Sequence, residues 1–500
     1  MDFITKEILE VFEDINTIPR CSRHEENIAN WLKEQALSAG LSFKFDSVNN
    51  VLISVPASKG YETSPVVVIQ GHMDMVCEKK QGSLHDFSKD PIRHIIEGDW
   101  LRADGTTLGA DNGIALAMAL VLARHREIPH PSLELLFTVD EETGLTGANE
   151  LMPDFISGKI LLNLDSEDEG VFIIGCAGGL NTTISMPLER TSLPGNHRVY
   201  CLVVSGLAGG HSGVDIHEKR ANANKLLVSA LNSLMDSTSL LLLSIDGGSA
   251  HNAIPRHAEA LVSFPPEQCE SAMSIIRQAE EEARKEYSEC DPSLSINISV
   301  QVADESLLPV SWDQGLTIVS LLEKLPHGVV RMSEDMPGIV QTSSNLATIR
   351  TENNRTEDGK AGGDRLVIVI SQRSSVKTEL QEITNKVAFI AGSVGADIAY
   401  SSGYPPWQPD RSSLLMKRCK DIYSKTFAEE PRTEVIHAGL ECAVIGSKFP
   451  GMDMISFGPT IRNPHSPDER LYIPSVPKVW EFLLALLASF RQDPKANTKR

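Results

Sequence analysis

The chain has 500 residues, of which 41% are apolar and 23% charged, and its formal net charge is −21. This composition excludes general disorder, and a chain of this length usually organises more than one hydrophobic core, so two domains are expected. The acidic balance argues against nucleic acids and anionic membrane surfaces as partners. Most of these charges are expected to serve solubility, and a few of them to hold metal ions.

The ends of the chain and its cysteines indicate a cytoplasmic protein. Residues 1–7 lack a basic segment followed by an apolar stretch, so they do not resemble a signal peptide. The longest apolar stretch, 479–490, is too short to span a bilayer and is typical of a packed terminal helix. The eight cysteines form no CxxC pair, so we expect reduced thiols, and Cys77 is expected to have a packing role.

The first part of the chain alternates helical and strand-like segments. In chain order, we expect helices at 6–17 and 24–39, a strand at 65–70, a helix at 113–125, a strand at 133–139, a short helix or turn at 142–151 and a strand at 159–164. The run at 65–70 is β-branched, as in a buried strand. Such alternation predicts an α/β fold, a doubly wound sheet with helices on both faces.

The pattern changes near residue 187, where strands begin to alternate with long amphipathic helices in an α+β pattern. The strands are expected at 197–205, 258–264, 294–302 and 366–371, and the helices at 221–236, 267–290 and 376–395. The polar stretch 353–363 is predicted to be an exposed hairpin loop. The earlier pattern returns after residue 403. We therefore expect one domain made of residues 1–186 and 404–500, with residues 187–403 inserted as a second domain.

Histidine and acidic side chains follow the expected strands at the points where these strands end. They are His72 and Asp74 after the strand at 65–70, Glu141 and Glu142 after that at 133–139, Asp165 after that at 159–164, and His465 in a loop after a strand expected at 453–457. In open α/β sheets, ligands gather outside the carboxyl ends of the strands. Asp111 precedes an apolar helix, where the helix dipole favours a carboxylate.

These residues meet the needs of a site for two divalent cations. Two such ions about 3.5–4 Å apart need a bridging group and roughly two terminal ligands each. The set that supplies them is His72, Asp111, Glu142, Asp165 and His465, with Asp111 as the bridge. Mixed histidine and carboxylate ligation suits zinc. Asp74 is placed to fix the tautomer of His72, and Glu141 is the expected general base, which passes a proton from water to the leaving amine.

Each fragment also has a purely structural interpretation. A single histidine after a strand is more often a hydrogen-bonded surface or core residue. The stretch Asp140–Glu142 before Thr-Gly is often a solvated turn, and Asn112-Gly113 is a common turn signal. The joint occurrence of all these fragments at strand ends, in order, favours the metal site.

At these residues the sequence resembles the co-catalytic zinc peptidase family that includes aminoacylases and glutamate carboxypeptidase. Within that family it is most similar to the aminoacyl-histidine dipeptidase (cytosolic nonspecific dipeptidase) branch, over essentially the whole chain. The matching stretches are Gly71–Val76, His85–Pro91, Gly105–Ile114, Glu141–Ala148, Leu164–Asp168, Cys176–Gly179, Gly209–Gly213, Ala223–Val228, His251–Arg256, Tyr404–Asp410, His437–Cys442 and Pro464–Glu469. Several of them are long and specific, which excludes chance agreement.

The resemblance implies the same five metal ligands, with Asp111 bridging, Glu141 as the general base and Asp74 orienting the first histidine. It also implies a cis peptide bond between Asp111 and Asn112. Residues 187–403 resemble an extended lid domain, which would close over a short substrate and exclude longer peptides.

The resemblance further implies a set of substrate-binding residues. These are His211, Asn252 and Arg373 in the lid, and His437 and Gly439, with Glu441 close by, at the substrate pocket. His211 matches a histidine that polarises the scissile carbonyl or contacts the substrate carboxylate. Arg373 matches a carboxylate-binding arginine, whose fork suits a dipeptide C-terminus.

The implied activity is hydrolysis of the peptide bond of dipeptides, including carnosine-like Xaa-His dipeptides. The implied cofactors are two Zn²⁺ per subunit, for which Mn²⁺ or Co²⁺ would substitute. A homodimer formed through the lid is a further expectation.

Two other functions compete with this one. The first is an aminoacylase or carboxypeptidase acting on N-acyl amino acids, against which the extended lid and the stretches at His85 and His437 argue. The second is a metal-loaded binding protein without catalysis, against which the presence of Glu141 argues.

Overall fold

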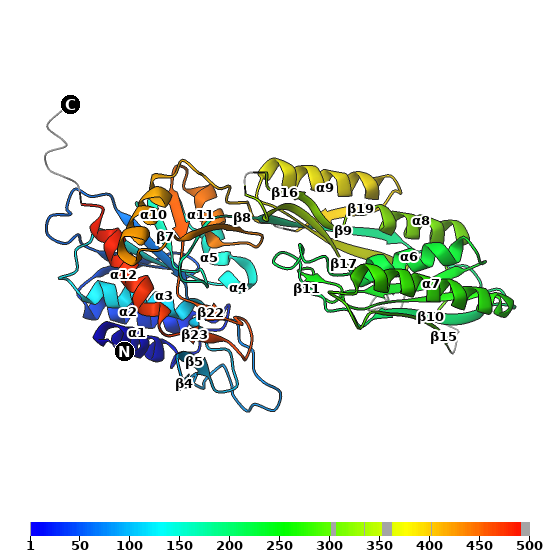
Figure 1. The fold of residues 1–500 in the computed structure, drawn as a ribbon, viewed down its shortest axis with the longest axis horizontal. Coiled ribbons are helices and arrows are strands. Elements are labelled where there is room, and N and C mark those ends of the chain that lie inside the picture. Colours follow the sequence, from blue (N-terminus) through cyan, green and yellow to red (C-terminus); the bar gives the residue numbers. More distant parts are fainter. Residues whose placement is uncertain (1, 302–306, 335, 353–362, 402, 492–500) are drawn as a thin grey trace. The chain divides into compact units, whose positions relative to one another are not determined.

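The computed structural model describes residues 2–301, 307–334, 336–352, 363–401 and 403–491, which fold into two compact units (Figure 1). The first unit comprises Met1–Cys176, Trp407–Val435 and Leu440–Arg500, and the second comprises Ala177–Pro406 and Ile436–Gly439. Residues 353–362 of the predicted hairpin loop lie outside the described residues. In the described parts of the chain, no helix has the length and apolar character needed to cross a membrane.

An eight-stranded sheet forms the centre of the first unit. In spatial order its strands are β1 (Ser42–Phe45), β2 (Val51–Val55), β6 (Leu133–Thr138), β3 (Val67–His72), β7 (Ile160–Asn163), β21 (Asp453–Ser456), β8 (Val171–Cys176) and β20 (Arg432–Ile436). The central strands β6, β3, β7 and β21 are parallel, so their carboxyl ends lie at one edge of the sheet. Every residue of β3 is buried, in keeping with the apolar run Val67–Ile69 with which the strand begins.

Helices surround this sheet, some in direct contact with it and some through another helix (Figure 1). They are α1 (Phe3–Ile15), α2 (Glu26–Ser38), α3 (Ala110–Arg124), α4 (Glu141–Gly144), α5 (Thr146–Glu150), α10 (Leu414–Phe427), α11 (Glu441–Lys448) and α12 (Ser475–Ala488). Helix α3 is apolar on all sides because it lies between β3 and α1. A four-stranded sheet of β22 (Ile461–Arg462), β23 (Arg470–Tyr472), β5 (Trp100–Ala103) and β4 (His94–Glu97) completes the unit. The predicted α/β class is confirmed.

The second unit is built on a nine-stranded antiparallel sheet. Its strands are β15 (Ser295–Val300), β10 (Arg198–Ser205), β14 (Ala258–Phe264), β12 (Leu241–Gly247), β17 (Val340–Glu352), β18 (Arg365–Ser374), β9 (Gly178–Pro187) and β19 (Asp397–Tyr400) in order, with β16 (Gly328–Met332) paired to β17. Its main helices are α6 (Ala223–Met235), α7 (Cys269–Tyr287), α8 (Trp312–Lys324) and α9 (Lys377–Gly392). One apolar core joins the sheet and these helices, and it includes Leu202, Leu231 and Ile368.

The second unit differs in extent from the predicted segment 187–403. Strand β9 begins at Gly178 and pairs with β18 along its whole length, so residues 178–186 lie in the second sheet. The change of sequence pattern near residue 187 therefore marks the end of β9, while the unit begins just after β8. Residues 436–439 also lie in this unit, although the sequence pattern around them resembles that of the first.

Cys21 and Cys77 form a disulfide, with their Cα atoms 5.7 Å apart. The expectation of reduced thiols, and of a packing role for Cys77, is wrong for this pair. The two cysteines are 56 residues apart in sequence, and they meet because the chain at Cys21 runs parallel to the chain at Met75. The backbone N–H of Met75 donates to the carbonyl of Arg20 at 3.1 Å. The other six cysteines are free, as expected.

Candidate functional site

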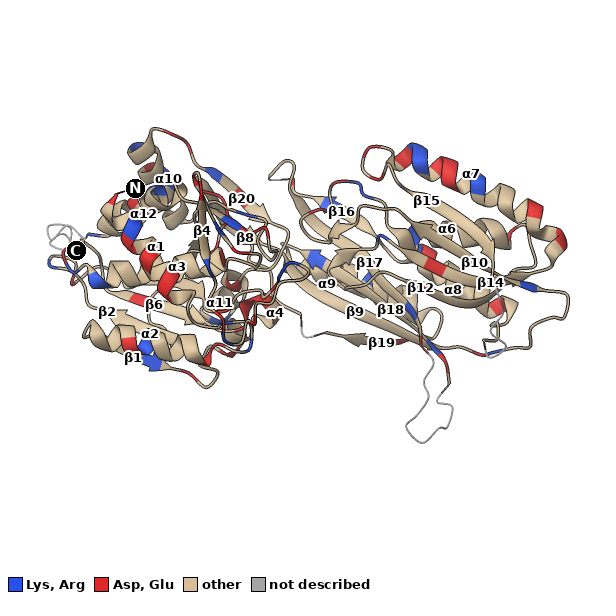
Figure 2. Ribbon diagram, turned by 90° about the horizontal axis from the view of Figure 1, so that it is seen from below, with Lys and Arg blue, Asp and Glu red and all other residues tan. Residues whose placement is uncertain are grey.

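All five predicted metal ligands lie in the first unit and come together in space. His72 is the last residue of β3, Asp111 lies in the first turn of α3, Glu142 lies in α4 directly after β6, Asp165 follows β7, and His465 lies in the loop after β22. Acidic residues accordingly gather around α4 (Figure 2). Parallel strands that end at one edge of a sheet explain how His72, Glu142 and Asp165 meet, although they are far apart in sequence.

The carboxylate of Asp111 lies between two imidazoles. Its Oδ1 is 3.1 Å from Nε2 of His72, and its Oδ2 is 3.1 Å from Nε2 of His465. Nε2 of His72 is also 3.4 Å from Asp165, and Nε2 of His465 is 3.0 Å from Glu142. Asp111 therefore occupies the position of a bridging group. The Asp111–Asn112 peptide bond is cis, as the resemblance implied.

Ligand-type atoms form two groups that share Asp111 and could each hold a metal ion. One group is His72, Asp111 and Asp165, and the other is Asp111, Glu142 and His465; the ligand atoms within each group lie within 4.8 Å of one another. One carboxylate oxygen of Asp165 and one of Glu142 are buried without a hydrogen-bond donor among the described residues. Buried oxygens are rarely left unpaired, so this donor set fits two divalent cations.

The charges of the site shift its pKa values strongly. Burial by itself would lower the pKa of His72, but Asp165, Asp111 and Asp74 outweigh it and raise this pKa well above the ordinary value. The pKa of His465 rises to about 11, because Asp111 and Glu142 likewise outweigh burial. Burial raises the pKa of Asp165 to about 6. Without metal, the histidines therefore carry protons that partly balance the crowded carboxylates.

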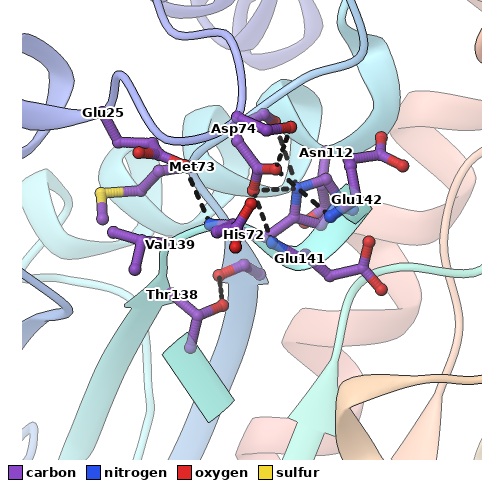
Figure 3. Close-up of polar contacts among 12 residues, drawn as sticks. Glu25, His72, Met73, Asp74, Asn112, Thr138, Val139, Glu141 and Glu142 are labelled. Carbon is purple, nitrogen blue, oxygen red and sulfur yellow. Dashed lines mark hydrogen bonds and ion pairs between the residues drawn. The ribbon is translucent and has the colours of Figure 1, made fainter. Parts of the chain in front are cut away.

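Asp74 holds His72 and α4 together (Figure 3). Its Oδ1 lies 3.3 Å from Nδ1 of His72 and accepts the backbone N–H of Glu141 at 3.0 Å. Its Oδ2 accepts from the N–H of Glu142 at 3.2 Å and from the hydroxyl of Ser22 at 2.8 Å. With Nδ1 facing Asp74, Nε2 of His72 is directed to the ligand group.

Glu141 lies beside the ligand atoms without belonging to either group that shares Asp111. One oxygen of its carboxylate lies within 4.8 Å of a ligand atom of His72 and of one of Glu142. Burial raises its pKa well above the usual value, and the charges of Asp165 and Glu142 add to this against the opposing effect of His72. A carboxylate in such a place is suited to exchange protons with a molecule bound at the site.

The predicted substrate-binding residues lie in the second unit, and three of them cluster there. Burial is the main reason that the pKa of His437 falls to about 3, and the nearby guanidinium of Arg373 and the ring of His211 lower it further. Nε2 of His437 lies 2.7 Å from the hydroxyl of Ser343, and Nη1 of Arg373 donates to the hydroxyl of Tyr404 at 2.8 Å. His437 is therefore a neutral, hydrogen-bonded ring.

His211 has a defined tautomer. Its Nδ1 accepts the backbone N–H groups of Gly213, at 3.3 Å, and Val214, at 3.1 Å, so the ring proton is on Nε2. The exposed Asn252 is close to it in the fold, because β11 (Gly210–His211) pairs with β13 (Ala253–Ile254). Gly439 lies against the ring of Tyr404, where a side chain would collide with that ring at 2.8 Å.

Glu441, which the resemblance placed close to the substrate pocket, lies in the first unit, unlike His437 and Gly439, and the structure also adds two residues that the sequence analysis did not single out. Glu441 is fully buried in the first unit, where it accepts from Thr138 at 2.7 Å and from Gln70 at 2.5 Å. Arg20 and Glu469 are also buried, and both bind the backbone of ligand-bearing loops. Glu469 is the last residue of the family-like stretch Pro464–Glu469, and this was the only sequence feature that could have pointed to it. Arg20 lies in none of these stretches.

Comparisons with known proteins agree with this geometry. The sequence profile of peptidase family M20/M25/M40 matches residues 68–489. The protein named cytosol non-specific dipeptidase from Escherichia coli (strain K12) is 37% identical over 479 residues, which are 96% of each chain. A second relative, the uncharacterized protein YqjE of Bacillus subtilis (strain 168), is 25% identical over 347 residues, which are 66% of this chain and 83% of that protein.

Solved structures give the same assignment. The crystal structure of aminoacylhistidine dipeptidase from Vibrio alginolyticus matches with a TM-score of 0.85 and 36% identity, over 97% of both chains. A tripeptidase from Staphylococcus aureus matches with a TM-score of 0.58 at 15% identity, over 98% of this chain and 99% of that chain, and shares the fold. The resemblance identified from the sequence motifs is thus confirmed, and the chain belongs to the peptidase family M20/M25/M40.

Proposed function

We propose that this peptidase hydrolyses dipeptides, including Xaa-His dipeptides of the carnosine type, with two zinc ions held by His72, Asp111, Glu142, Asp165 and His465. The single observation that carries the proposal is the Asp111 carboxylate, which presents one oxygen to His72 and the other to His465. Manganese and cobalt favour similar ligands and would substitute for zinc. The names of the Escherichia coli and Vibrio alginolyticus relatives support the dipeptide substrate and the histidine-containing class.

Metal ions bound between these residues would lower the pKa of a water molecule and polarise the scissile carbonyl. Glu141 would accept a proton from a water molecule at the site as the water oxygen adds to the scissile carbonyl carbon, and would deliver it to the amine nitrogen as the C–N bond breaks. Nearby cations would reverse the raised pKa of Glu141 and keep its carboxylate ionised. Asp74 keeps Nε2 of His72 available and holds the backbone of Glu141 in place.

The second unit supplies substrate recognition in this proposal. His211 has its proton on Nε2 and is suited to donate a hydrogen bond to the scissile carbonyl oxygen. Arg373 binds the substrate carboxylate through its guanidinium fork. Asn252, His437 and Gly439 complete this recognition set, and residues 187–403, which contain His211, Asn252 and Arg373, are proposed to act as a lid domain.

We place the protein in the cytoplasm, as the name of its Escherichia coli relative suggests for that protein. The Cys21–Cys77 disulfide is unusual for such a compartment, so thiol titration of protein from intact cells is a direct test. Homodimer formation stays a prediction, which light scattering on the purified protein would check.

The decisive experiment for the activity is Glu141→Ala. We expect this variant to retain two metal ions per chain, because Glu141 is not one of the proposed ligands, and to lose nearly all turnover. Glu150→Ala is the matched control, because Glu150 is an exposed carboxylate in the neighbouring helix. Full turnover by Glu141→Ala would remove Glu141 from the mechanism.

The substrate class is tested with dipeptides, their N-acetyl forms and tripeptides, each assayed with zinc, manganese and cobalt. A dipeptidase cleaves the free-amine dipeptides, including β-alanyl-histidine, in preference to the others. Preference for N-acetyl substrates would identify an aminoacylase instead. Cleavage that a chelator stops and zinc restores would exclude a binding protein without catalysis.

A further inference from the structure

The buried carboxylate of Glu469 binds the backbone on which Asp111 is carried. It accepts the N–H groups of Leu108 at 2.7 Å, Gly109 at 2.9 Å, Ala110 at 2.8 Å and Asp111 at 3.3 Å. Only 2% of Glu469 is exposed. Successive N–H groups at a helix start form a concave site for an anion, and here a side chain of the chain itself fills it.

Arg20 makes the complementary contacts on the other side of the same loop. Its Nη1 donates to the carbonyls of Met73 and Asp74, each at 3.0 Å, and its Nη2 donates to the carbonyl of Gly109 at 2.6 Å. The guanidinium thus connects the loop after His72 to the loop before Asp111. A side chain at Gly109 would overlap Nη2 of Arg20, and the positive φ of 69° at this residue also favours glycine.

Two buried ionisable side chains therefore join three segments that carry proposed ligands. Arg20 joins residues 72–74 to residues 108–111, and Glu469 joins residues 108–111 to the loop that contains His465. Burying such charges is expensive unless they are fully hydrogen-bonded. Burial lowers the pKa of Arg20 to about 10, and among the acidic groups around it Glu469 opposes this effect most. Neither residue belongs to the two ligand groups. The free-energy cost of burying Arg20 and Glu469 is explained if they set the geometry of the residues in those groups.

We infer that Glu469 is a positioning residue, which holds Asp111 at the bridging place and fixes its distance from His465, with Arg20 as its partner. This inference rests on the proposed two-metal site. Groups that orient metal ligands typically change metal affinity by roughly 10–100-fold when they are replaced. The effect should fall mainly on the ion shared by Asp111, Glu142 and His465, because Glu469 contacts the backbone of one ligand and shares a loop with another.

Glu469→Gln tests this inference, because it keeps the shape of the side chain but turns one of its two acceptor oxygens into a donor facing backbone N–H groups. Glu469→Asp is the second variant, which keeps the charge but shortens the side chain. Asp468→Asn is the matched control, because it removes a carboxylate from the same loop, where the side chain of Asp468 is 69% exposed and pairs with Lys80 on the surface. Zinc affinity is measured for all three by competition with a chelator, and hydrogen exchange of amides 108–111 is measured in the metal-free proteins.

For Glu469→Gln we expect at least tenfold faster amide exchange at residues 108–111 without metal, and at least a tenfold loss of affinity for one of two zinc ions. Glu469→Asp should show smaller changes in both amide exchange and zinc affinity, and Asp468→Asn should match the wild type in both. Unchanged exchange and zinc affinity in Glu469→Gln would overturn the inference, as would failure of both Glu469 variants to fold, which would make the residue purely structural. If the wild type fails to bind two zinc ions, the proposed site is refuted instead. Hydrogen exchange of amides 108–111 would then still test whether Glu469 holds this backbone.

Discussion

The carboxylate of Asp74 accepts the backbone N–H of Glu141 at 3.0 Å, although the two residues are 67 positions apart in sequence. The same carboxylate faces Nδ1 of His72. One side chain thereby sets both the tautomer of a proposed ligand and the position of the proposed base. Asp74 is fully buried, so its ionised form persists only because these donors surround it.

Asp74→Asn should therefore damage metal binding and turnover together. The amide would point a donor at backbone N–H groups or at Nδ1–H, and the geometry of His72 and of Glu141 would relax. We expect zinc affinity to fall by roughly 10–100-fold. Added zinc should refill the site without restoring kcat, because Glu141 stays displaced. Metal content and steady-state kinetics at increasing zinc concentrations would measure both effects.

Asp104→Asn provides the control for that variant, because Asp104 is an exposed carboxylate of the same unit. It should behave as the wild type does. Full recovery of kcat by zinc in Asp74→Asn would show that Asp74 serves His72 alone.

Metal binding should be strongly pH-dependent. In the metal-free protein the pKa of His465 is raised to about 11 and that of His72 lies well above its ordinary value, so both rings are protonated at pH 7. A metal ion must displace these protons to reach Nε2. The affinity for zinc should therefore rise with pH across the neutral range. Below pH 6 it should be weaker still, because Asp165 also gains a proton there.

Calorimetry of zinc binding in buffers with different ionisation enthalpies would count the released protons. We expect the observed heat to depend clearly on the buffer at pH 7, with more than one proton released for two ions. His465→Gln should reduce that number. Heats that are the same in every buffer would contradict the protonated histidines.

The Cys21–Cys77 disulfide should stabilise the first unit. It closes a loop of 56 residues and ties the segment that carries Arg20 to the segment after Asp74. A cross-link over such a loop typically contributes about 2–4 kcal/mol to the free energy of unfolding. Cys77→Ser should lower the denaturant midpoint accordingly, whereas Cys201→Ser in the second unit, whose thiol is free, should not.

Thiol titration in denaturant gives an independent check of this bond. Protein prepared without reductant should show six reactive thiols, and eight after reduction. Eight thiols before reduction would mean that the pair is reduced in solution, and Cys77→Ser should then lose little stability.

The sequence predicted the parts of the molecule that depend on local patterns. The β-branched run before His72 and the apolar segment after Asp111 are a strand and a helix in the structure, with ends shifted by a few residues. Four of the five proposed ligands were predicted from one rule, that side chains after the strands of an open sheet meet at one edge, and Asp111 was predicted from its place before an apolar helix. Both inferences needed only neighbouring residues and a general topology.

Other features depended on long-range pairing and could not be predicted in this way. The start of β9 was missed because only its pairing with β18 distinguishes Gly178 from the preceding strand. Cys21 and Cys77 meet only through the packed loops. Glu469 was named only as the end of a family-like stretch, because its contacts are with backbone N–H groups some 360 residues away in sequence.

Arg373 should distinguish substrates by their C-terminal carboxylate. The guanidinium is held by the hydroxyl of Tyr404, and only 7% of the residue is exposed, so it is preorganised for a planar anion. Arg373→Lys should raise KM for a dipeptide at least tenfold, or about 1.4 kcal/mol in binding free energy, and change kcat less. The corresponding dipeptide C-terminal amide, which lacks the anion, should be cleaved equally by both proteins. Tyr404→Phe should have a smaller effect of the same kind, because it removes only the contact that orients Arg373.

The dipeptide amide also supplies the outcome that would contradict this role. If Arg373→Lys raises KM for the amide as much as for the dipeptide, Arg373 acts on the fold of the second unit instead, because a structural defect would not distinguish a carboxylate from an amide.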